Sequence, residues 1–178
     1  MVPRRGRGAG GLRRVRAWDL AATTPRPGAD PDWTAGLLLG RQGNDGDFFV
    51  LDVRRVRTTP REVERLVVQT AGLDGRGTAV AMEQEPGSSG AALAERYARL
   101  LAGFRFRAER STGDKLTRAL PLAASAEAGL VRLVRGPWNA AFLDEAESFP
   151  LGTHDDQVDA AALAFGWLTA RRKFTFFC

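Results

Sequence analysis

Two metal-binding residue types are almost missing from this chain of 178 residues, which has one cysteine, Cys178, and one histidine, His154. A single cysteine cannot form an intrachain disulfide, and the lack of further cysteine or histidine excludes the usual zinc-binding patterns. No apolar run is long enough to span a bilayer, and no apolar segment follows the basic N-terminus as it does in a secretory signal. We therefore expect a cytosolic protein with no membrane partner.

The charge of the chain favours a polyanionic partner. Lys and Arg number 26 against 21 Asp and Glu, a formal net charge of +5, and nucleic acid is the simplest partner for such a chain. The hydrophobic fraction of 44% is that of a globular protein, so one domain with a real core is expected. We predict a flexible Gly/Arg-rich leader over residues 1–11, a folded domain over 12–170 and a C-terminal tail over 171–178.

The hydrophobic pattern predicts an α/β fold. Residues 42–47 have the composition of a hairpin turn, so the strands on either side are expected to pair antiparallel. Thr59, Pro60 and Glu62 match a capping box at a helix start. Strands are predicted at 12–22, 35–39, 48–56, 78–82, 104–108 and 130–134, and helices at 59–71, 91–102, 114–128, 138–147 and 155–171. An antiparallel start of three strands followed by strand–helix units indicates a mixed sheet flanked by helices.

Acidic residues stand at three telling places in this pattern. Asp19 is on the first strand, and Glu83 and Glu85 follow a buried strand on one face, because the strand period is two. Three more acidic residues open the last helix, namely Asp155, Asp156 and Asp159. Each has an ordinary explanation as a solvated strand end, a turn residue or an acidic helix start that favours the helix dipole.

If the strands are adjacent, these carboxylates converge on one edge of the sheet. Ligand sets made of oxygen suit Mg²⁺ or Mn²⁺ rather than zinc. Two such ions would activate a water and stabilise the leaving oxygen of a phosphodiester, and they would relieve the repulsion among like charges.

Five segments give this arrangement a family resemblance. In chain order they are RAWDLAA at 16–22, MEQEPGSSG at 82–90, GDKLTRA at 113–119, GPWN at 136–139 and FPLGTHDDQVDA at 149–160. Together they resemble the C-terminal nuclease domain of the large terminase subunit of tailed bacteriophages, and the likeness covers about residues 12–170. The resemblance implies an RNase H-like fold and a two-metal endonuclease that cuts concatemeric double-stranded viral DNA during packaging, with little sequence preference. It also implies that the protein acts in the host cytoplasm, with an ATPase domain, the small terminase subunit and the portal protein as partners.

The resemblance also suggests roles for individual residues. Asp19, Glu83 and Asp156 would be catalytic, with Asp19 bridging two Mg²⁺ or Mn²⁺ ions. Glu85 is the rival of Glu83, whereas Asp155 and Asp159 would support Asp156 or bind the second metal.

Each basic residue near these positions has more than one interpretation. Lys115 and Arg118 either contact DNA, orient carboxylates or are ordinary helix-surface charges. Arg54 and Arg55 either guide DNA or, as we favour, belong with Arg57 to a solvated strand face. His154 either orients a carboxylate, contacts phosphate or, as we favour, simply precedes the helix.

Other functions stay open on the sequence alone. No GxxxxGK(S/T) loop is present, so the packaging ATPase is not expected here, and the chain would be a nuclease-domain fragment or one whose ATPase half is separate or lost. A junction resolvase or transposase-type nuclease would have the same fold class. A DNA-binding or motor-docking module would cut weakly by itself. A basic α/β domain with acidic helix caps would leave the placing of the carboxylates unexplained.

Overall fold

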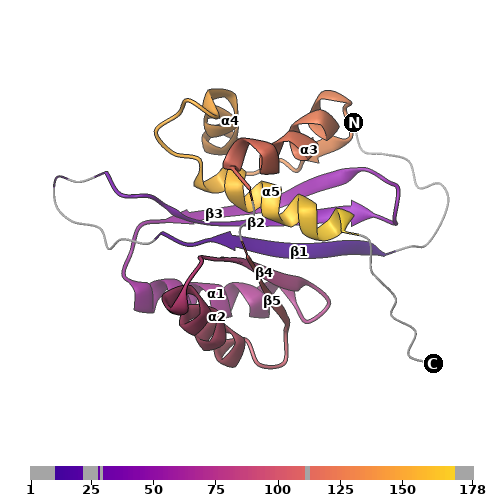
Figure 1. Ribbon diagram of the computed structural model, residues 1–178. Coiled ribbons are helices and arrows are strands. Elements are labelled where there is room, and N and C mark those ends of the chain that lie inside the picture. The colour runs from indigo at the N-terminus through magenta and orange to yellow at the C-terminus, as the bar shows by residue number, and fades with distance from the viewer. Residues whose placement is uncertain (1–10, 22–27, 29, 111–112, 171–178) are drawn as a thin grey trace.

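A computed structural model describes residues 11–21, 28, 30–110 and 113–170, so the predicted leader and tail lie almost wholly outside the described residues. These residues form one six-stranded sheet of order β5-β4-β1-β2-β3-β6 (Figure 1). The strands are β1 (Leu12–Asp19), β2 (Thr34–Gln42), β3 (Phe48–Val56), β4 (Ala79–Gln84), β5 (Arg105–Arg110) and β6 (Val131–Leu133). The helices are α1 (Pro60–Asp74), α2 (Ser88–Leu100), α3 (Lys115–Glu127), α4 (Asn139–Ser148) and α5 (Asp156–Thr169).

The sheet is mixed, as the sequence predicts. The predicted hairpin joins β2 to β3, and β2 also pairs antiparallel with β1. The remaining pairs, β1 with β4, β4 with β5 and β3 with β6, are parallel. An antiparallel start followed by parallel strands confirms the fold class. No helix in the described ranges has the length and apolar character needed to cross a membrane.

Helices cover both faces of the sheet. Figure 1 shows α1 and α2 on one face and α3, α4 and α5 on the other. Alternate residues of β1 supply the two cores, because successive side chains of a strand point to opposite faces. Val15 and Ala17 pack with α5, whereas Trp18 packs with α1 and α2. By the same alternation Asp19, the last residue of β1, lies on the α5 face.

Helix α5 is the most buried helix of the described chain. Its alanines Ala160, Ala161 and Ala164 join the core formed with β1 and β2, and small side chains allow a helix to lie close to a sheet. The helix ends at Thr169, two residues before the predicted end at Arg171, a residue that lies outside the described ranges. The placement of α5 over β1 brings its acidic first turn to the end of that strand.

Two helix starts test the local predictions. The capping box of α1 is confirmed, because Thr59 accepts from the Glu62 N–H and Glu62 accepts from the Thr59 N–H. The predicted start of α2 near Ala91 is wrong, because the helix begins at Ser88. A β-carbon at Gly90 would lie 2.0 Å from the Glu85 carbonyl oxygen, which shows how tightly this turn returns on the strand end. Strand β4 ends at Gln84, so the expectation that Glu85 shares a strand face with Glu83 is wrong.

A buried arginine connects β1 to helix α1 and strand β3. Arg16 is 1% exposed. Its Nε lies 2.8 Å from Asp74 Oδ2 at the end of α1, and its Nη2 lies 2.9 Å from Asp52 Oδ2 on β3. Its Nη1 donates to the Gly36 carbonyl oxygen at 3.0 Å. Each nitrogen of the guanidinium therefore has an acceptor, which offsets the cost of burying its charge.

Replacing Arg16 with methionine is expected to lower the free energy of unfolding by about 3–5 kcal/mol, because it leaves buried Asp74 without its counter-ion. Urea denaturation measures the change. Arg96→Ala is the matched control: Arg96 is 58% exposed in its pair with Glu64, so its loss should destabilise the protein far less than the loss of Arg16. Equal effects of the two substitutions would contradict a stabilising role for the buried network.

Candidate metal centre

Two of the predicted carboxylates stand at the ends of neighbouring strands. Trp18 of β1 is in register with Met82 of the parallel strand β4, so Asp19 and Glu83 follow as the next pair. Ala17 and Ala81, two residues earlier, both face α5, which puts Asp19 and Glu83 on the α5 face as well. Both strands are interior ones, so the carboxylates meet at the ends of central strands rather than along an edge strand.

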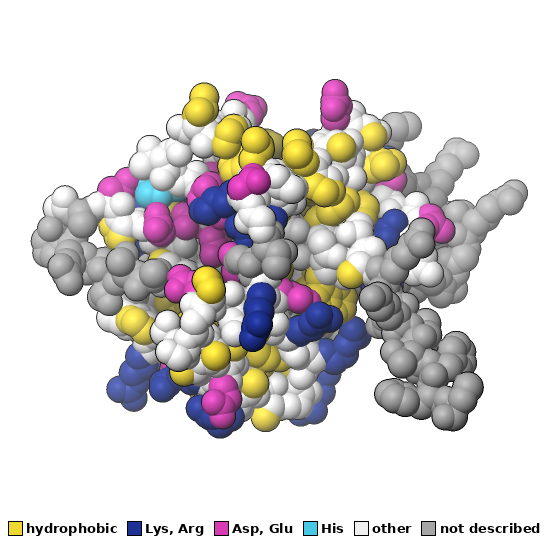
Figure 2. Space-filling view, viewed as in Figure 1, with side chains coloured by type: hydrophobic (Ala, Val, Ile, Leu, Met, Phe, Trp, Pro, Cys, Tyr) yellow, Lys and Arg dark blue, Asp and Glu magenta, His cyan; other side chains and the backbone are white. Residues whose placement is uncertain are grey.

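The first turn of α5 adds two buried carboxylates to this pair. Asp156 and Asp159 are each 5% exposed. Burial, and then the charges of Asp159, Glu83 and Asp156, raise the pKa of Asp19 to about 8, while Lys115 opposes the rise. We call Asp19, Glu83, Asp156 and Asp159 the acidic centre. In the view of Figure 2, acidic side chains gather near the middle of the molecule, with Lys and Arg side chains beside them.

Two basic residues of α3 hold the acidic centre together. Asp114 caps this helix by accepting from the Thr117 N–H, which sets the direction of the first turn. Lys115 Nζ then lies 2.8 Å from Asp155 Oδ1 and 2.9 Å from Asp159 Oδ2.

One turn later, Arg118 Nη1 lies 2.8 Å from Glu83 Oε2, and its Nη2 lies 3.6 Å from Asp159 Oδ1. Of the two functions considered for Lys115 and Arg118, the ion pairs that they form match the orientation of carboxylates.

The N-terminus of α5 is capped by a residue that the sequence pattern did not reveal. Asp155 stands at the N-cap position, yet its side chain makes no capping hydrogen bond. Instead Glu145 of α4, which is 6% exposed, accepts from the backbone N–H groups of Gln157 and Val158. Gln157 Nε2 also donates to Glu145. Glu145, and not the acidic cluster, therefore makes these capping hydrogen bonds, and Asp156 and Asp159 stand in the first turn of the helix as buried rather than solvated carboxylates.

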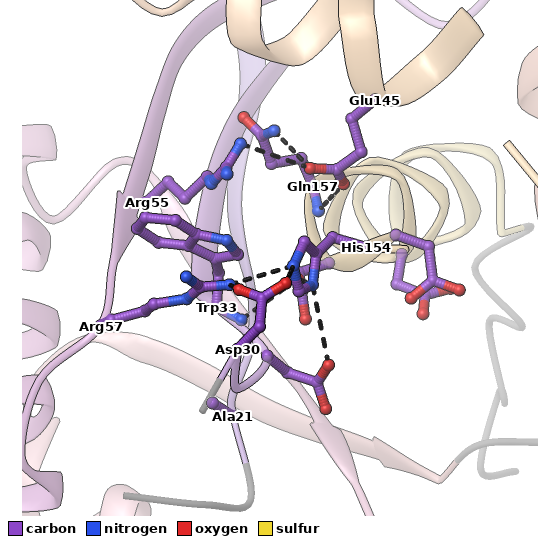
Figure 3. Close-up of polar contacts among 12 residues, drawn as sticks. Ala21, Asp30, Trp33, Arg55, Arg57, Glu145, His154 and Gln157 are labelled. Atoms are coloured by element: carbon purple, nitrogen blue, oxygen red, sulfur yellow. Dashed lines mark hydrogen bonds and ion pairs between the residues drawn. The ribbon is translucent and has the colours of Figure 1, made fainter. Parts of the chain in front are cut away.

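A second group of side chains borders Asp156. The Trp33 backbone N–H donates to Asp156 Oδ2 at 3.1 Å. His154 Nε2 lies 2.9 Å from Asp30 Oδ2 and 3.0 Å from Arg57 Nη2, as the dashed lines in Figure 3 mark. Within the described ranges, one group of three has ligand atoms all within 4.8 Å of one another, namely Asp32, His154 and Asp156. His154 thus precedes the helix, as favoured, and also lies beside a carboxylate.

Comparison with known families identifies the fold. A model of the terminase RNaseH-like domain matches residues 16–166. The chain belongs to this family. Comparison with curated proteins finds no significant match.

Solved structures of terminase nucleases share the architecture of this terminase domain. The large terminase nuclease of thermophilic phage G20c with bound zinc has a TM-score of 0.64 at 18% identity, over 87% of this chain and 81% of that one. The P22 large terminase nuclease domain also has a TM-score of 0.64, at 14% identity over 92% and 84%. A fowlpox virus Holliday junction resolvase has a TM-score of 0.53 at 9% identity, over 87% and 96%. The predicted resemblance and the RNase H-like fold are confirmed.

The terminase domain presents donors that fit divalent cations. The acidic centre offers carboxylate oxygens, which Mg²⁺ and Mn²⁺ prefer, and a cation among them would offset both the burial and the like charges that raise the pKa of Asp19. His154 adds an imidazole nitrogen next to Asp156, a donor that suits softer divalent metals such as zinc. The residues present therefore fit a metal centre at the end of β1.

The remaining predicted residues lie outside the acidic centre. Glu85 is exposed and lines a cleft of about 330 Å³ together with Asp19 and Glu83. Arg54 pairs with Asp52 at 3.2 Å. The solvated-face interpretation is wrong for Arg55 and Arg57, whose side chains are 27% and 23% exposed and lie over the ring of Trp33.

Proposed function

We propose that this terminase domain is a metal-dependent endonuclease that hydrolyses phosphodiester bonds of double-stranded DNA with little sequence preference. The observation that carries the proposal is the convergence of four carboxylates at the ends of β1, β4 and the start of α5, where burial and then the charges of the other three raise the pKa of Asp19 to about 8. Such a cluster is costly without a cation. Membership of the terminase RNaseH-like domain family supports the same chemistry.

The proposed cofactors are two Mg²⁺ or Mn²⁺ ions, which would activate a water and stabilise the leaving oxygen. Asp19 would contact both ions and Glu83 would hold one from the second strand. From α5 we assign Asp156 and Asp159 together. The sequence ranks Asp156 first, but the charge of Asp159 has the larger effect on the pKa of Asp19. Lys115 and Arg118 would hold these carboxylates in place and meet phosphates only from the rim.

The proposed setting is the host cytoplasm during packaging of concatemeric viral DNA. The partners would be double-stranded DNA, the packaging ATPase, the small terminase subunit and the portal protein. The net charge of +5 supports binding to the duplex backbone. A junction-resolving nuclease is a second candidate, because the fowlpox virus resolvase shares the fold. A comparison of a linear duplex with a four-way junction as substrates distinguishes the two.

Nicking of a supercoiled plasmid tests the proposed function, with Glu83→Gln and Glu85→Gln as a matched pair. Glu83 is held by Arg118 at the acidic centre, whereas Glu85 follows the strand and is exposed. Loss of a metal ligand is expected to slow nicking about 100-fold or more in Glu83→Gln, while Glu85→Gln stays within about threefold of wild type. Chelation of divalent ions should abolish nicking, and Mg²⁺ or Mn²⁺ should restore it.

Two outcomes would contradict the proposal. Nicking that persists at full rate in a chelator would exclude a metal-dependent nuclease. DNA binding without any nicking in Mg²⁺ or Mn²⁺ would favour a DNA-binding or motor-docking module instead.

A further inference from the structure

We propose that Trp33 is a positioning residue, whose indole is clamped between Arg55 and Arg57 so that its backbone N–H holds the carboxylate of Asp156 in place. We call these three side chains the Trp33 stack. The inference rests on the proposed function, because it concerns Asp156 as a metal ligand. It goes beyond that function because Trp33 itself has no ligand atom for a metal.

The stack fixes the indole from both sides. The guanidinium carbons of Arg55 and Arg57 each lie 4.0 Å from the centre of the Trp33 ring. Arg55 lies near the end of β3 and Arg57 directly follows the strand, and both guanidinium groups reach the same indole. Figure 3 shows the indole between them. Cation–π contacts of this kind are attractive, and they are stronger where water is excluded.

The clamped residue is bonded to the candidate ligand through its main chain. The Trp33 N–H donates to Asp156 Oδ2 at 3.1 Å, across 123 positions of sequence. Trp33 immediately precedes β2, whose first residue is Thr34, so the strand anchors the peptide on one side. The Trp33 stack anchors it through the side chain. The direction of the N–H toward Asp156 therefore depends on two independent supports.

Arg57 of the Trp33 stack is also connected to Asp156 through His154. Arg57 Nη2 lies 3.0 Å from His154 Nε2, and His154 Nδ1 lies 3.9 Å from Asp156 Oδ2. Asp30, from the segment that leads to Trp33, contacts both Arg57 and His154. The segment before β2 and the segment before α5 are thus joined by Arg57 next to the carboxylate.

The stack retains this geometry at a cost in hydrogen bonds. Trp33 Nε1, Arg55 Nε and Arg57 Nε are buried, and none of them has a hydrogen-bond partner within the described part of the chain. A buried donor without a partner costs about 1–3 kcal/mol. Unsatisfied groups of this kind are expected where geometry serves a functional site rather than stability alone.

The test compares Trp33→Leu with Trp33→Phe. The leucine removes the aromatic face, whereas the phenylalanine keeps a ring between the arginines. Titration calorimetry with Mn²⁺ alone should give an affinity about 10- to 100-fold weaker for Trp33→Leu and within about threefold of wild type for Trp33→Phe. In the metal-free protein, hydrogen exchange should show faster exchange of the residue-33 amide in Trp33→Leu, by at least about tenfold. In nicking assays kcat should fall and KM for DNA should stay constant.

Each result bears on one proposal or the other. If wild type binds no Mn²⁺, the proposed function fails. If wild type binds Mn²⁺ and Trp33→Leu binds it equally well, the positioning role fails and the proposed function stands. Should Trp33→Leu not fold, Arg55→Met opens one side of the stack and is expected to weaken Mn²⁺ binding about threefold to tenfold. A folded Arg55→Met protein with wild-type affinity would overturn the positioning role.

The chain offers a matched control for the arginine. Arg105 lies over the ring of Trp167 at 5.5 Å, an Arg–Trp contact that involves no residue of the acidic centre. Arg105→Met should therefore leave Mn²⁺ affinity unchanged. A loss of affinity in Arg105→Met equal to that in Arg55→Met would show a general effect of arginine removal and contradict the proposal.

Discussion

Asp19→Asn is expected to reduce plasmid nicking by at least about 1,000-fold and, at the same time, to stabilise the metal-free protein at pH 8. Activity is expected to fall because a neutral amide would bind the proposed divalent ions less well than a carboxylate does. Stability rises because the amide is neutral. In the native protein burial and the charges of Asp159, Glu83 and Asp156 raise the pKa of Asp19 to about 8, so the ionised form is disfavoured there.

The direction of the pH dependence follows from this pKa. The folded protein keeps the proton on Asp19 up to about pH 8, whereas an unfolded chain loses it near the ordinary value of 3.8. Between these two pH values the folded state binds more protons, so stability falls as pH rises. For one such group the slope is at most about 1.4 kcal/mol per pH unit. Asp19→Asn should remove this part of the slope, which denaturant titrations at pH 5 and pH 8 in a chelator will measure.

Asp45→Asn is the control for this prediction. Asp45 is exposed in the turn between β2 and β3, so its substitution should change neither nicking nor the pH dependence of stability. If Asp19→Asn cuts DNA at the wild-type rate, Asp19 is not a ligand. If it cuts poorly but leaves the pH dependence of stability intact, Asp19 is not the group that titrates near pH 8.

The sequence allowed the first two carboxylates to be placed because strand ends obey simple rules. A short apolar run identifies an interior strand, and parallel neighbours bring their carboxyl ends together, as β1 and β4 do. The period of two then puts Asp19 and Glu83 on one face. Glu85 escaped these rules because the position where β4 ends depends on the tight turn at Gly90, a contact between backbones that no residue pattern reveals.

Contacts between helices and loops were beyond the reach of sequence patterns. Glu145 caps α5 from another helix, and no local spacing links residue 145 to the N–H of residue 157. The Trp33 stack likewise needs the hairpin and the preceding segment to be folded first. Arginines are read as surface charges by default. Burial of Arg16 in an ion pair with Asp74 becomes visible only when α1 is packed on the sheet.

Roles of the basic residues were open for a related reason. Lys115 and Arg118 are separated from their carboxylate partners by 30 or more positions. The sequence shows only that their spacing within α3 puts the two on one side of the helix. A sequence shows that a lysine is near a loop, but it does not show which acid the ammonium meets. The structure pairs both residues with acidic side chains, and this pairing sets the competition on which the next prediction depends.

The affinity of the metal-free protein for Mn²⁺ is expected to rise about tenfold for each pH unit between pH 6 and pH 8, and to level off above pH 8. Below pH 8 a cation must displace the proton from Asp19 before the carboxylate can bind it. At pH 6 this competition weakens apparent binding on the order of 100-fold relative to its limit. Titration calorimetry across this range measures the slope.

The number of protons released gives an independent check. Titrations at pH 6.5 in two buffers with different ionisation enthalpies should show release of about one proton per bound ion group, falling toward half a proton at pH 8. Lys115→Met is the informative variant, because Lys115 lowers the pKa of Asp19 and its loss should move the whole profile to higher pH. An affinity that is independent of pH, with no proton released, would show that Asp19 is ionised in the metal-free protein. Lys115 and Arg118 alone would then have to relieve the repulsion that argues for a cation at this centre.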